Sequence, residues 1–417
     1  MAAAPTSARR KGSRQARSSG MPSFLSHEEL NGLKHYQYKS GGYTVLDDLH
    51  NPVWNWAVEQ LPMWLAPNLI TLIASGCVAA AYALNTLYLP DFTGEAPGWV
   101  YLLTALSVVA YVNLDCMDGK QARRTGSSSP LGQLFDHGCD ALVLHMMLGN
   151  IAASLGISVS LKMAFGCMGI LFPWILAQWE EYHTGVMMYG TRLYGVLEAN
   201  YSICIVHLAS WALGPKVWAV TLPMPFVGGV TLADASLLVV GMAGMAQAVH
   251  NVARVMHPGA ASLPAHEAGN KQLGRPAAMR HLLGLLAVLV LGALLLHQAD
   301  GCDALYARLA FSVFGFLYAL MATRLIISHM CKEPLPLPWL PILLLVAAVS
   351  GGMLRGTAVP LPSFLAAWAP DAGDVAMVLV ATAVVGCYSV YILSIIEQIC
   401  GFLGIRVLTI TPRPPRK

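Results

Sequence analysis

Residues 114–141 read LDCMDGKQARRTGSSSPLGQLFDHGCDA and place four aspartates at fixed spacings between two apolar runs. Asp115 and Asp118 are three residues apart, and Asp136 and Asp140 are four residues apart. If each pair is helical, its two carboxylates lie on one face of a helix. The pattern therefore predicts two acidic helix faces that could confront each other.

The apolar surroundings of these carboxylates indicate a metal site. Ionisable groups near a bilayer interior are costly unless they are paired or bind a metal ion. Carboxylate oxygens are the natural ligands of Mg²⁺, Mn²⁺ and Ca²⁺, and four aspartates can hold two such ions around a phosphoryl group. The alternative is that the aspartates cap helices or pair with Lys120, Arg123 and Arg124.

The composition of the whole chain predicts the fold class. Of 417 residues, 56% are hydrophobic and only 11% are charged, which is not the balance of a soluble domain. We expect an all-α integral membrane protein with about ten transmembrane helices, each of roughly 20 residues. The candidate spans are 66–88, 98–117, 133–155, 159–179, 193–213, 230–252, 279–298, 304–328, 337–354 and 376–402.

The charges between the spans alternate. Loops rich in Lys and Arg precede the first span and follow the second, as in the segment around Lys120 and Arg124. The intervening loops carry acids such as Asp91 and Asp300. Because cytoplasmic loops are enriched in Lys and Arg, both termini and the aspartate pattern are expected on the cytoplasmic side.

The N-terminal region is divided into two predicted segments. Residues 1–22 form a disordered basic arm, with an organelle transit peptide as the alternative for residues 1–20. Residues 23–64 form a cytoplasmic or interfacial segment, in which Phe24, Leu25, Leu30 and Leu33 predict an amphipathic helix on the membrane surface. A soluble capping helix is the alternative.

The nine cysteines lack the spacing of a zinc site or a disulfide framework.

The pattern from Asp115 to Asp140 resembles the signature of the CDP-alcohol phosphotransferases at all eight of its fixed positions. Three further runs resemble the eukaryotic choline/ethanolamine phosphotransferase branch: WLAPNLIT at 64–71, DHGCD at 136–140 and WEEYHTG at 179–185. The WEEYHTG run looks more like the ethanolamine-type members of this branch. The resemblance implies the CDP-alcohol phosphotransferase fold, with a catalytic core at 65–213, C-terminal transmembrane helices at 214–402 and a cytoplasmic tail at 403–417.

The resemblance also implies a reaction. CDP-ethanolamine or CDP-choline and diacylglycerol would give phosphatidylethanolamine or phosphatidylcholine and CMP, by direct attack without a covalent enzyme intermediate. Two Mg²⁺ or Mn²⁺ ions would bind Asp115, Asp118, Asp136 and Asp140. The CDP moiety would lie against Gly119, Ala122, Arg123 and Gly132. The expected setting is the endoplasmic reticulum or Golgi membrane, with the site facing the cytosol, membrane lipid around it, a homodimer as the assembly and no nucleic-acid partner.

The residue that accepts the proton from diacylglycerol has two candidates. Asp140 could act as the base, but a carboxylate occupied by metal ions is a weak one. His137 is the other candidate, because imidazole has a suitable pKa, and Glu198 could orient it. Asn68 contacts cytidine or caps the first span. Two alternatives, substrate contact and an interfacial role, are kept for Glu180, Glu181 and His183.

Two rival functions remain at this stage. A cation-dependent transporter would also carry intramembrane carboxylates, but it predicts an internal repeat, and the aspartate pattern does not recur. A CDP-alcohol phosphotransferase acting on another headgroup or lipid is the second rival, and a catalytically silent member of the fold is disfavoured by the intact eight positions.

Overall fold

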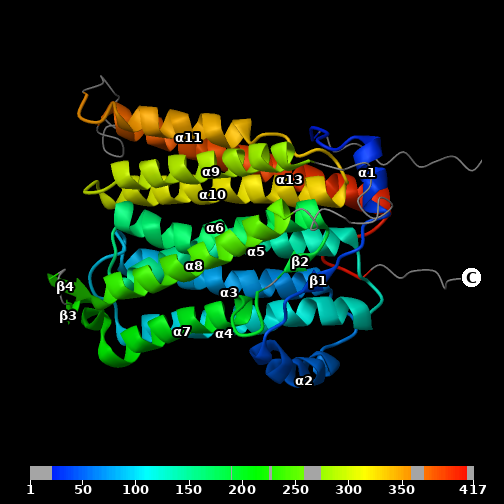
Figure 1. Cartoon of the computed structure of the whole chain (residues 1–417), viewed down its shortest axis with the longest axis horizontal. Coiled ribbons are helices and arrows are strands. Elements are labelled where there is room, and N and C mark those ends of the chain that lie inside the picture. The colour runs from blue at the N-terminus through cyan, green and yellow to red at the C-terminus, as the bar shows by residue number, and fades with distance from the viewer. Residues whose placement is uncertain (1–20, 189, 225–227, 258–273, 358–370, 411–417) are drawn as a thin grey trace, which may run out of the picture.

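The protein is a bundle of long, apolar helices (Figure 1). The computed structural model describes residues 21–188, 190–224, 228–257, 274–357 and 371–410. Within these residues, nine helices are long and apolar enough to cross a membrane, and a tenth apolar helix is shorter. Residues 1–20 of the predicted arm at 1–22 and most of the loop after the sixth span lie outside the described residues.

The spans observed follow the predicted ones with small shifts at their ends. The nine long helices are α3 Pro67–Tyr88, α4 Gly98–Arg124, α5 Pro130–Leu155, α6 Leu161–Thr184, α7 Val196–Leu213, α8 Leu232–Met256, α9 Arg275–Gln298, α10 Ala304–Met330 and α13 Ala372–Leu403, and the short one is α11 Trp339–Gly352. The largest shift is in α4, which was expected to end near residue 117 and instead continues to Arg124, so both Asp115 and Asp118 are helical.

The helices pack as two neighbouring groups. Helix α4 packs against α3 and α7, and α3 also packs against α5. On the other side, α6 packs against α8 and α9, and α10 packs against α5, α9 and α13. The most buried span is α10, with side chains such as Phe311, Phe314 and Tyr318 fully enclosed. Helix α5 therefore lies between the two groups and presents its aspartates toward α4.

Strand structure in the described residues is limited to two short pairs. Strand β1, Ser40–Gly41, runs parallel to β2, Met187–Met188, and so ties the N-terminal segment to the loop after α6. Strands β3, Thr221–Met224, and β4, Gly228–Thr231, form an antiparallel pair at the opposite end of the bundle (Figure 1). A short 3-10 helix, Pro215–Ala219, follows α7.

The predicted amphipathic helix forms, but it packs on protein. Helix α1, His27–Leu33, begins with a capping box at Ser26 and Glu29. Leu33 is only 1% exposed, and the backbone N–H of Leu25 donates to Gln398 on α13 at 2.9 Å. Helix α1 therefore corresponds to the capping alternative, because its apolar side is used against the bundle.

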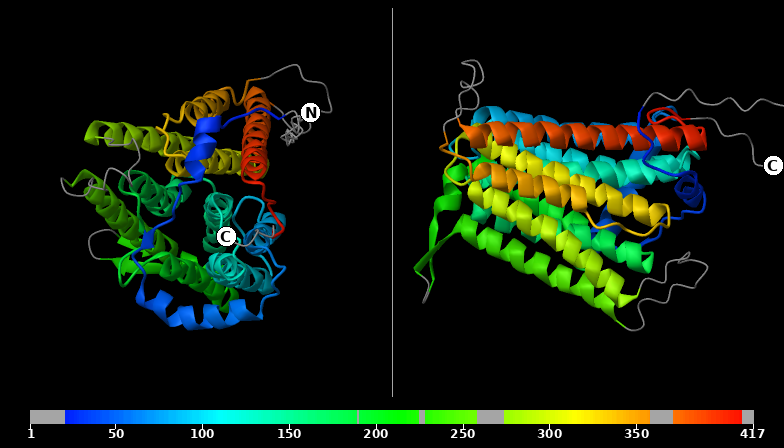
Figure 2. Two further views of the ribbon diagram at one scale, coloured as in Figure 1. Left: turned by 90° about the vertical axis from the view of Figure 1, so that its right-hand side faces the viewer. Right: turned by 90° about the horizontal axis from the view of Figure 1, so that it is seen from above.

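An exposed apolar stripe lies instead on helix α2, Val45–Gln60. Val45, Leu49, Val53 and Trp56 are all exposed and recur at helical spacing. The opposite side of α2 packs on the bundle, where the Trp54 indole N–H donates to Asn113 at 2.9 Å. Figure 2 shows α2 lying across the end of the bundle rather than along the spans. This orientation is typical of a helix that lies in the plane of a membrane surface.

Candidate functional site

Three of the four aspartates meet at one point between α4 and α5. Asp115, Asp118 and Asp136 each offer a carboxylate oxygen, and these oxygens lie within 4.8 Å of one another. Asp118 is buried, and Asp115 and Asp136 are half-buried. The helical spacing that was read from the sequence brings these acids together because α4 extends one full turn beyond Asp118. We call the end of the bundle that carries this cluster the site end.

Neutral hydroxyl groups hold two of the aspartates. The Thr71 hydroxyl on α3 donates to Asp118, and the Tyr111 phenol on α4 donates to Asp140. Asp140 lies one turn from Asp136 on α5 but is not one of the three acids whose oxygens gather. Thr71 and Tyr111 were not singled out in the sequence, because their partners become apparent only when three helices are placed side by side.

The aspartate cluster fits a divalent cation. Asp115 Oδ1 and Asp136 Oδ1 are buried oxygens without a hydrogen-bond partner. A buried carboxylate oxygen without a donor is costly, and several of them at one point repel one another. Hard cations such as Mg²⁺ and Mn²⁺ take this kind of all-oxygen donor set. The cluster therefore supplies the oxygen ligands that such an ion needs. Without an ion, Asp115 Oδ1 and Asp136 Oδ1 have no hydrogen-bond donor.

His137 is buried beside the cluster and is held by two glutamine side chains. Its Nε2 lies 2.5 Å from the Gln133 amide and its Nδ1 lies 3.1 Å from the Gln178 amide, while Asp136 Oδ2 is 3.7 Å from Nε2. Gln133 is one turn away on the same helix, whereas Gln178 comes from α6. Gln178 was missed in the sequence, because a glutamine inside an apolar span carries no pattern of its own.

Glu198 does not meet His137 in the structure. Its carboxylate accepts from the backbone N–H of Gly195 at 2.9 Å, which caps the start of α7. The two ring nitrogens of His137 face Gln133 and Gln178 instead. The hypothesis that Glu198 orients His137 therefore has no geometric counterpart here, and the local reason is that a Glu at the third helical position reaches back to its own helix start.

Comparison with known proteins gives the family. Residues 64–222 match the CDP-alcohol phosphatidyltransferase family. The chain is similar to Cholinephosphotransferase 1 of Xenopus laevis, at 32% identity over 75% of this chain and 76% of that protein. It is also similar to Cholinephosphotransferase 1 of Mus musculus, at 33% identity over 75% of this chain and 76% of that protein. The chain belongs to the CDP-alcohol phosphatidyltransferase family. It is a multi-pass membrane transferase, as the resemblance at residues 115–140 predicted.

The positions at which the resemblance places the CDP moiety lie on α4 and α5, the two helices that carry the aspartate cluster. A Cβ atom on Gly119 would stand 3.6 Å from Arg123 Nη1, and one on Gly132 would stand 3.6 Å from Asn68 Oδ1. Asn68 is buried and donates through Nδ2 to the carbonyl oxygen of Val407 at 3.0 Å. The N-cap of α3 is Ala66, without a side-chain cap, so the interpretation of Asn68 as a cap is wrong.

The basic residues after Asp118 in this phosphatidyltransferase do not pair with the aspartates. Lys120 contacts Asn51 and Asn55 of α2 at 2.5 and 2.7 Å. Arg124 donates to the backbone carbonyls of Glu59 and Leu61 at 3.0 and 2.7 Å. The alternative in which the acids are neutralised by these two side chains is therefore wrong. Lys120 and Arg124 fasten α2 to the end of α4, and Arg123 stays exposed beside Gly119.

The WEEYHTG run ends α6 at the site end. Glu180 and Glu181 are both buried, and His183 lies 3.4 Å from His281 of α9. None of these three side chains is merely interfacial, because each contacts a residue of another helix.

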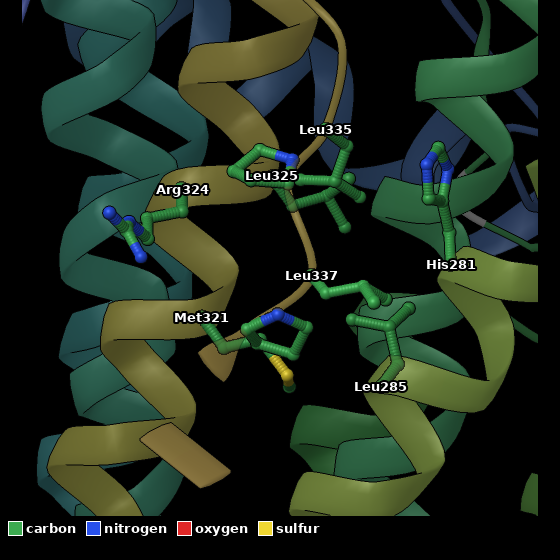
Figure 3. Close-up of a pocket in the computed structure, with 9 residues that line it drawn as sticks. His281, Leu285, Met321, Arg324, Leu325, Leu335 and Leu337 are labelled. Atoms are coloured by element: carbon green, nitrogen blue, oxygen red, sulfur yellow. The ribbon is translucent and has the colours of Figure 1, made fainter. Parts of the chain in front are cut away.

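A separate pocket lies between α9, α10 and the segment at 335–338 (Figure 3). Its lining is mostly apolar, with His281 and Arg324 as the basic members. None of the predicted site residues lines it. The pocket is therefore distinct from the aspartate cluster.

Proposed function

We propose that this transferase moves phosphocholine or phosphoethanolamine from the CDP-alcohol to diacylglycerol, giving phosphatidylcholine or phosphatidylethanolamine and CMP. The observation that carries the proposal is the cluster of Asp115, Asp118 and Asp136 at the end of a membrane-spanning bundle, within a chain similar to cholinephosphotransferases. A water-soluble pyrophosphate and a membrane lipid can meet only where a site is open to both phases. The site end of a transmembrane bundle meets that requirement.

The aspartates would hold two Mg²⁺ or Mn²⁺ ions. Asp115, Asp118 and Asp136 supply converging oxygens, and Asp140 is the fourth candidate, one turn deeper on α5. When bound, such ions neutralise the pyrophosphate and make CMP a better leaving group. Thr71 fixes the orientation of Asp118, and Tyr111 fixes that of Asp140. Each hydroxyl donates to one oxygen of the carboxylate, so the second carboxylate oxygen can bind a metal ion.

His137 is our preferred proton acceptor, and Asp140 remains the alternative. Imidazole is the side chain most often used as a general base, and the two glutamine amides hold this ring in one orientation. The diacylglycerol hydroxyl would attack the β-phosphorus directly while its proton passes to the base. Glu198 has a capping role in the structure, so we leave it out of the proton path.

The nucleotide would lie against the start of α5 and the end of α4. Gly119, Ala122 and Gly132 leave space there, and the Arg123 guanidinium offers fixed positive charge to a phosphate. Asn68 borders the same space from α3 and presents its amide oxygen toward Gly132. A cytidine contact is therefore our proposal for Asn68.

Two similarities bear on the headgroup. The WEEYHTG run resembles ethanolamine-type members, whereas the relatives from Xenopus laevis and Mus musculus are named Cholinephosphotransferase 1. We therefore propose activity with both headgroups, with choline favoured by overall similarity. We further propose a homodimer in the endoplasmic reticulum or Golgi membrane, with the site facing the cytosol.

Purified protein in detergent, given diacylglycerol, Mn²⁺ or Mg²⁺ and either CDP-choline or CDP-ethanolamine, tests the proposal through CMP release and lipid product. Asp136→Asn should lower turnover at least about 100-fold, because metal-ligand oxygens carry the chemistry. The matched control is Asp91→Asn, which changes an exposed loop acid beyond α3 and should leave turnover unchanged. Product from neither nucleotide, with folded protein, would overturn the proposal and favour another headgroup or lipid.

A further inference from the structure

Two adjacent glutamates at the end of α6 have very different surroundings. Glu180 is fully buried, accepts from the Asn251 amide at 2.7 Å and pairs with Arg254 Nε at 2.7 Å. Glu181 is 5% exposed, and its ionic contact is the more distant His329 Nε2 at 3.6 Å. A buried carboxylate is costly without a positive group close by. Glu181 therefore lacks the full ionic partner that its neighbour has.

The face of α6 that carries Glu181 also carries a residue that contacts the catalytic site. Gln178 precedes Glu181 by three residues, so the two side chains share one face of the helix. Gln178 contacts Nδ1 of His137, and His137 lies next to Asp136. Moving from the aspartate cluster along this face, the next acidic side chain toward the helix end is Glu181.

The N-terminal strap, which we define as residues 35–44, runs beside the same face. Its β1 strand pairs with β2 just after α6 (Figure 1). The Tyr38 ring meets the His137 ring at a centroid distance of 5.8 Å, and the Tyr36 ring meets His329 at 5.7 Å. Two aromatic rings of the strap thus follow the line from His137 to Glu181.

Electrostatics agree with this placement. Burial, with the charge of Glu181 and the neighbouring Tyr38 phenol as smaller causes, raises the pKa of Tyr36 well above its usual range. The Tyr36 phenol therefore stays neutral, and it is close enough to Glu181 to feel its charge. A carboxylate flanked by neutral aromatic rings is suited to a cation with methyl or methylene groups.

We propose that Glu181, with the rings of Tyr36 and Tyr38, binds the alkylammonium end of the CDP-alcohol. This inference rests on the proposed function, because a choline or ethanolamine headgroup brings the positive charge. The headgroup nitrogen is joined to the transferred phosphorus by a short ethylene spacer. Three residues, or about 4.5 Å along the helix axis, separate the level of Gln178 beside the reacting centre from that of Glu181, so the spacer has a suitable length.

A binding experiment on the full-length enzyme in detergent isolates the headgroup charge. Calorimetry compares CDP-choline with its uncharged carbon isostere, CDP-3,3-dimethylbutanol, and with CMP. We expect wild-type protein to prefer CDP-choline over the isostere about tenfold, which is the scale of a desolvated cation–aromatic contact with a carboxylate. Glu181→Gln should abolish this preference and leave the affinity for CMP unchanged. An unchanged preference in Glu181→Gln would overturn the proposal.

Matched variants separate headgroup binding from a structural role. If Glu181 served only as the partner of His329, His329→Asn would abolish the preference as fully as Glu181→Gln, and the proposal would fail. Tyr38→Leu should weaken the preference and Tyr38→Phe should keep it, which tests the ring if Glu181→Gln does not fold. These readouts need no turnover. A charge preference without lipid product would contradict the proposed function alone, and lipid product with the preference intact in Glu181→Gln would contradict this inference alone.

Discussion

Single hydroxyl groups orient the acids of the site. Tyr111 donates to Asp140 from within α4, and Thr71 donates to Asp118 from α3. Both donors are neutral, so they orient the carboxylates without cancelling the charge that a cation requires. In metalloproteins, partners of this kind typically change metal affinity or activity by about 10- to 100-fold when they are removed.

Tyr111→Phe should therefore raise the Mn²⁺ concentration needed for half-maximal activity by about tenfold. The measurement is turnover at a series of Mn²⁺ concentrations with saturating nucleotide. Tyr101→Phe is the matched control, because Tyr101 is on the same helix at its other end, where its hydroxyl only accepts from the Ala96 backbone N–H at 3.2 Å. Equal metal dependence in Tyr111→Phe and wild type would show that Asp140 does not need its hydroxyl partner.

The sequence predicts the aspartate cluster but does not predict which side chains contact His137. Asp115, Asp118 and Asp136 meet as their spacing predicted, because helical periodicity alone sets each pair on one face. The contact between His137 and Gln178 joins α5 to α6, and nothing local in either helix encodes it. Glu198 was assigned to His137 by resemblance, and its own backbone cap competes for the carboxylate.

At the scale of whole elements, the spans could be predicted from apolar length, but the role of the N-terminal helices could not. Helix α1 has the amphipathic pattern of a surface helix, but Leu33 is buried against the bundle and the His27 ring meets Phe402 of α13 at a centroid distance of 5.8 Å. Helix α2 carries the exposed stripe, yet Pro52 in its interior makes it a poor helix candidate in sequence. Amphipathicity shows that a helix has an apolar side and does not show whether protein or lipid covers it.

The contact between α6 and α8 depends on glycine. A Cβ atom on Gly244 would stand 2.0 Å from the carbonyl oxygen of Gly169, and one on Gly241 would meet the Phe165 ring at 2.5 Å. Small residues allow helices to approach closely in membranes, where packing replaces the hydrophobic effect. Because the obstacle at Gly244 is backbone, a rotamer change cannot relieve it.

Gly244→Ala should consequently destabilise the protein by about 1–3 kcal/mol, the usual cost of overpacking. Thermal unfolding in detergent, followed by tryptophan fluorescence, should show a lower midpoint. Gly76→Ala on α3 is the matched control, since no atom lies within 4 Å of its added Cβ. That control should be neutral or slightly stabilising, because alanine favours helix by up to about 1 kcal/mol over glycine. Equal midpoints for the two variants would contradict the close α6–α8 contact.

At the scale of the whole molecule, charge divides the two ends of the bundle. The site end carries Lys120, Arg123 and Arg124, and α1 lies at the same end beside the last turns of α13 (Figure 2). The loop at the far end of α3 carries Asp91 and Glu95. Basic loops are retained on the cytoplasmic side during insertion.

An N-glycosylation acceptor placed on a flexible linker between Asp91 and Glu95 should therefore be modified in microsomes, and the same insert between Thr125 and Pro130 should not. The first loop follows α3 at the acidic end, whereas the second joins α4 to α5 at the site end, so one helix length separates them. A mobility shift removed by an endoglycosidase reports modification. The reverse pattern would place the aspartate site in the lumen, where cytosolic CDP-alcohol could not reach it, and would contradict the proposed reaction and its location together.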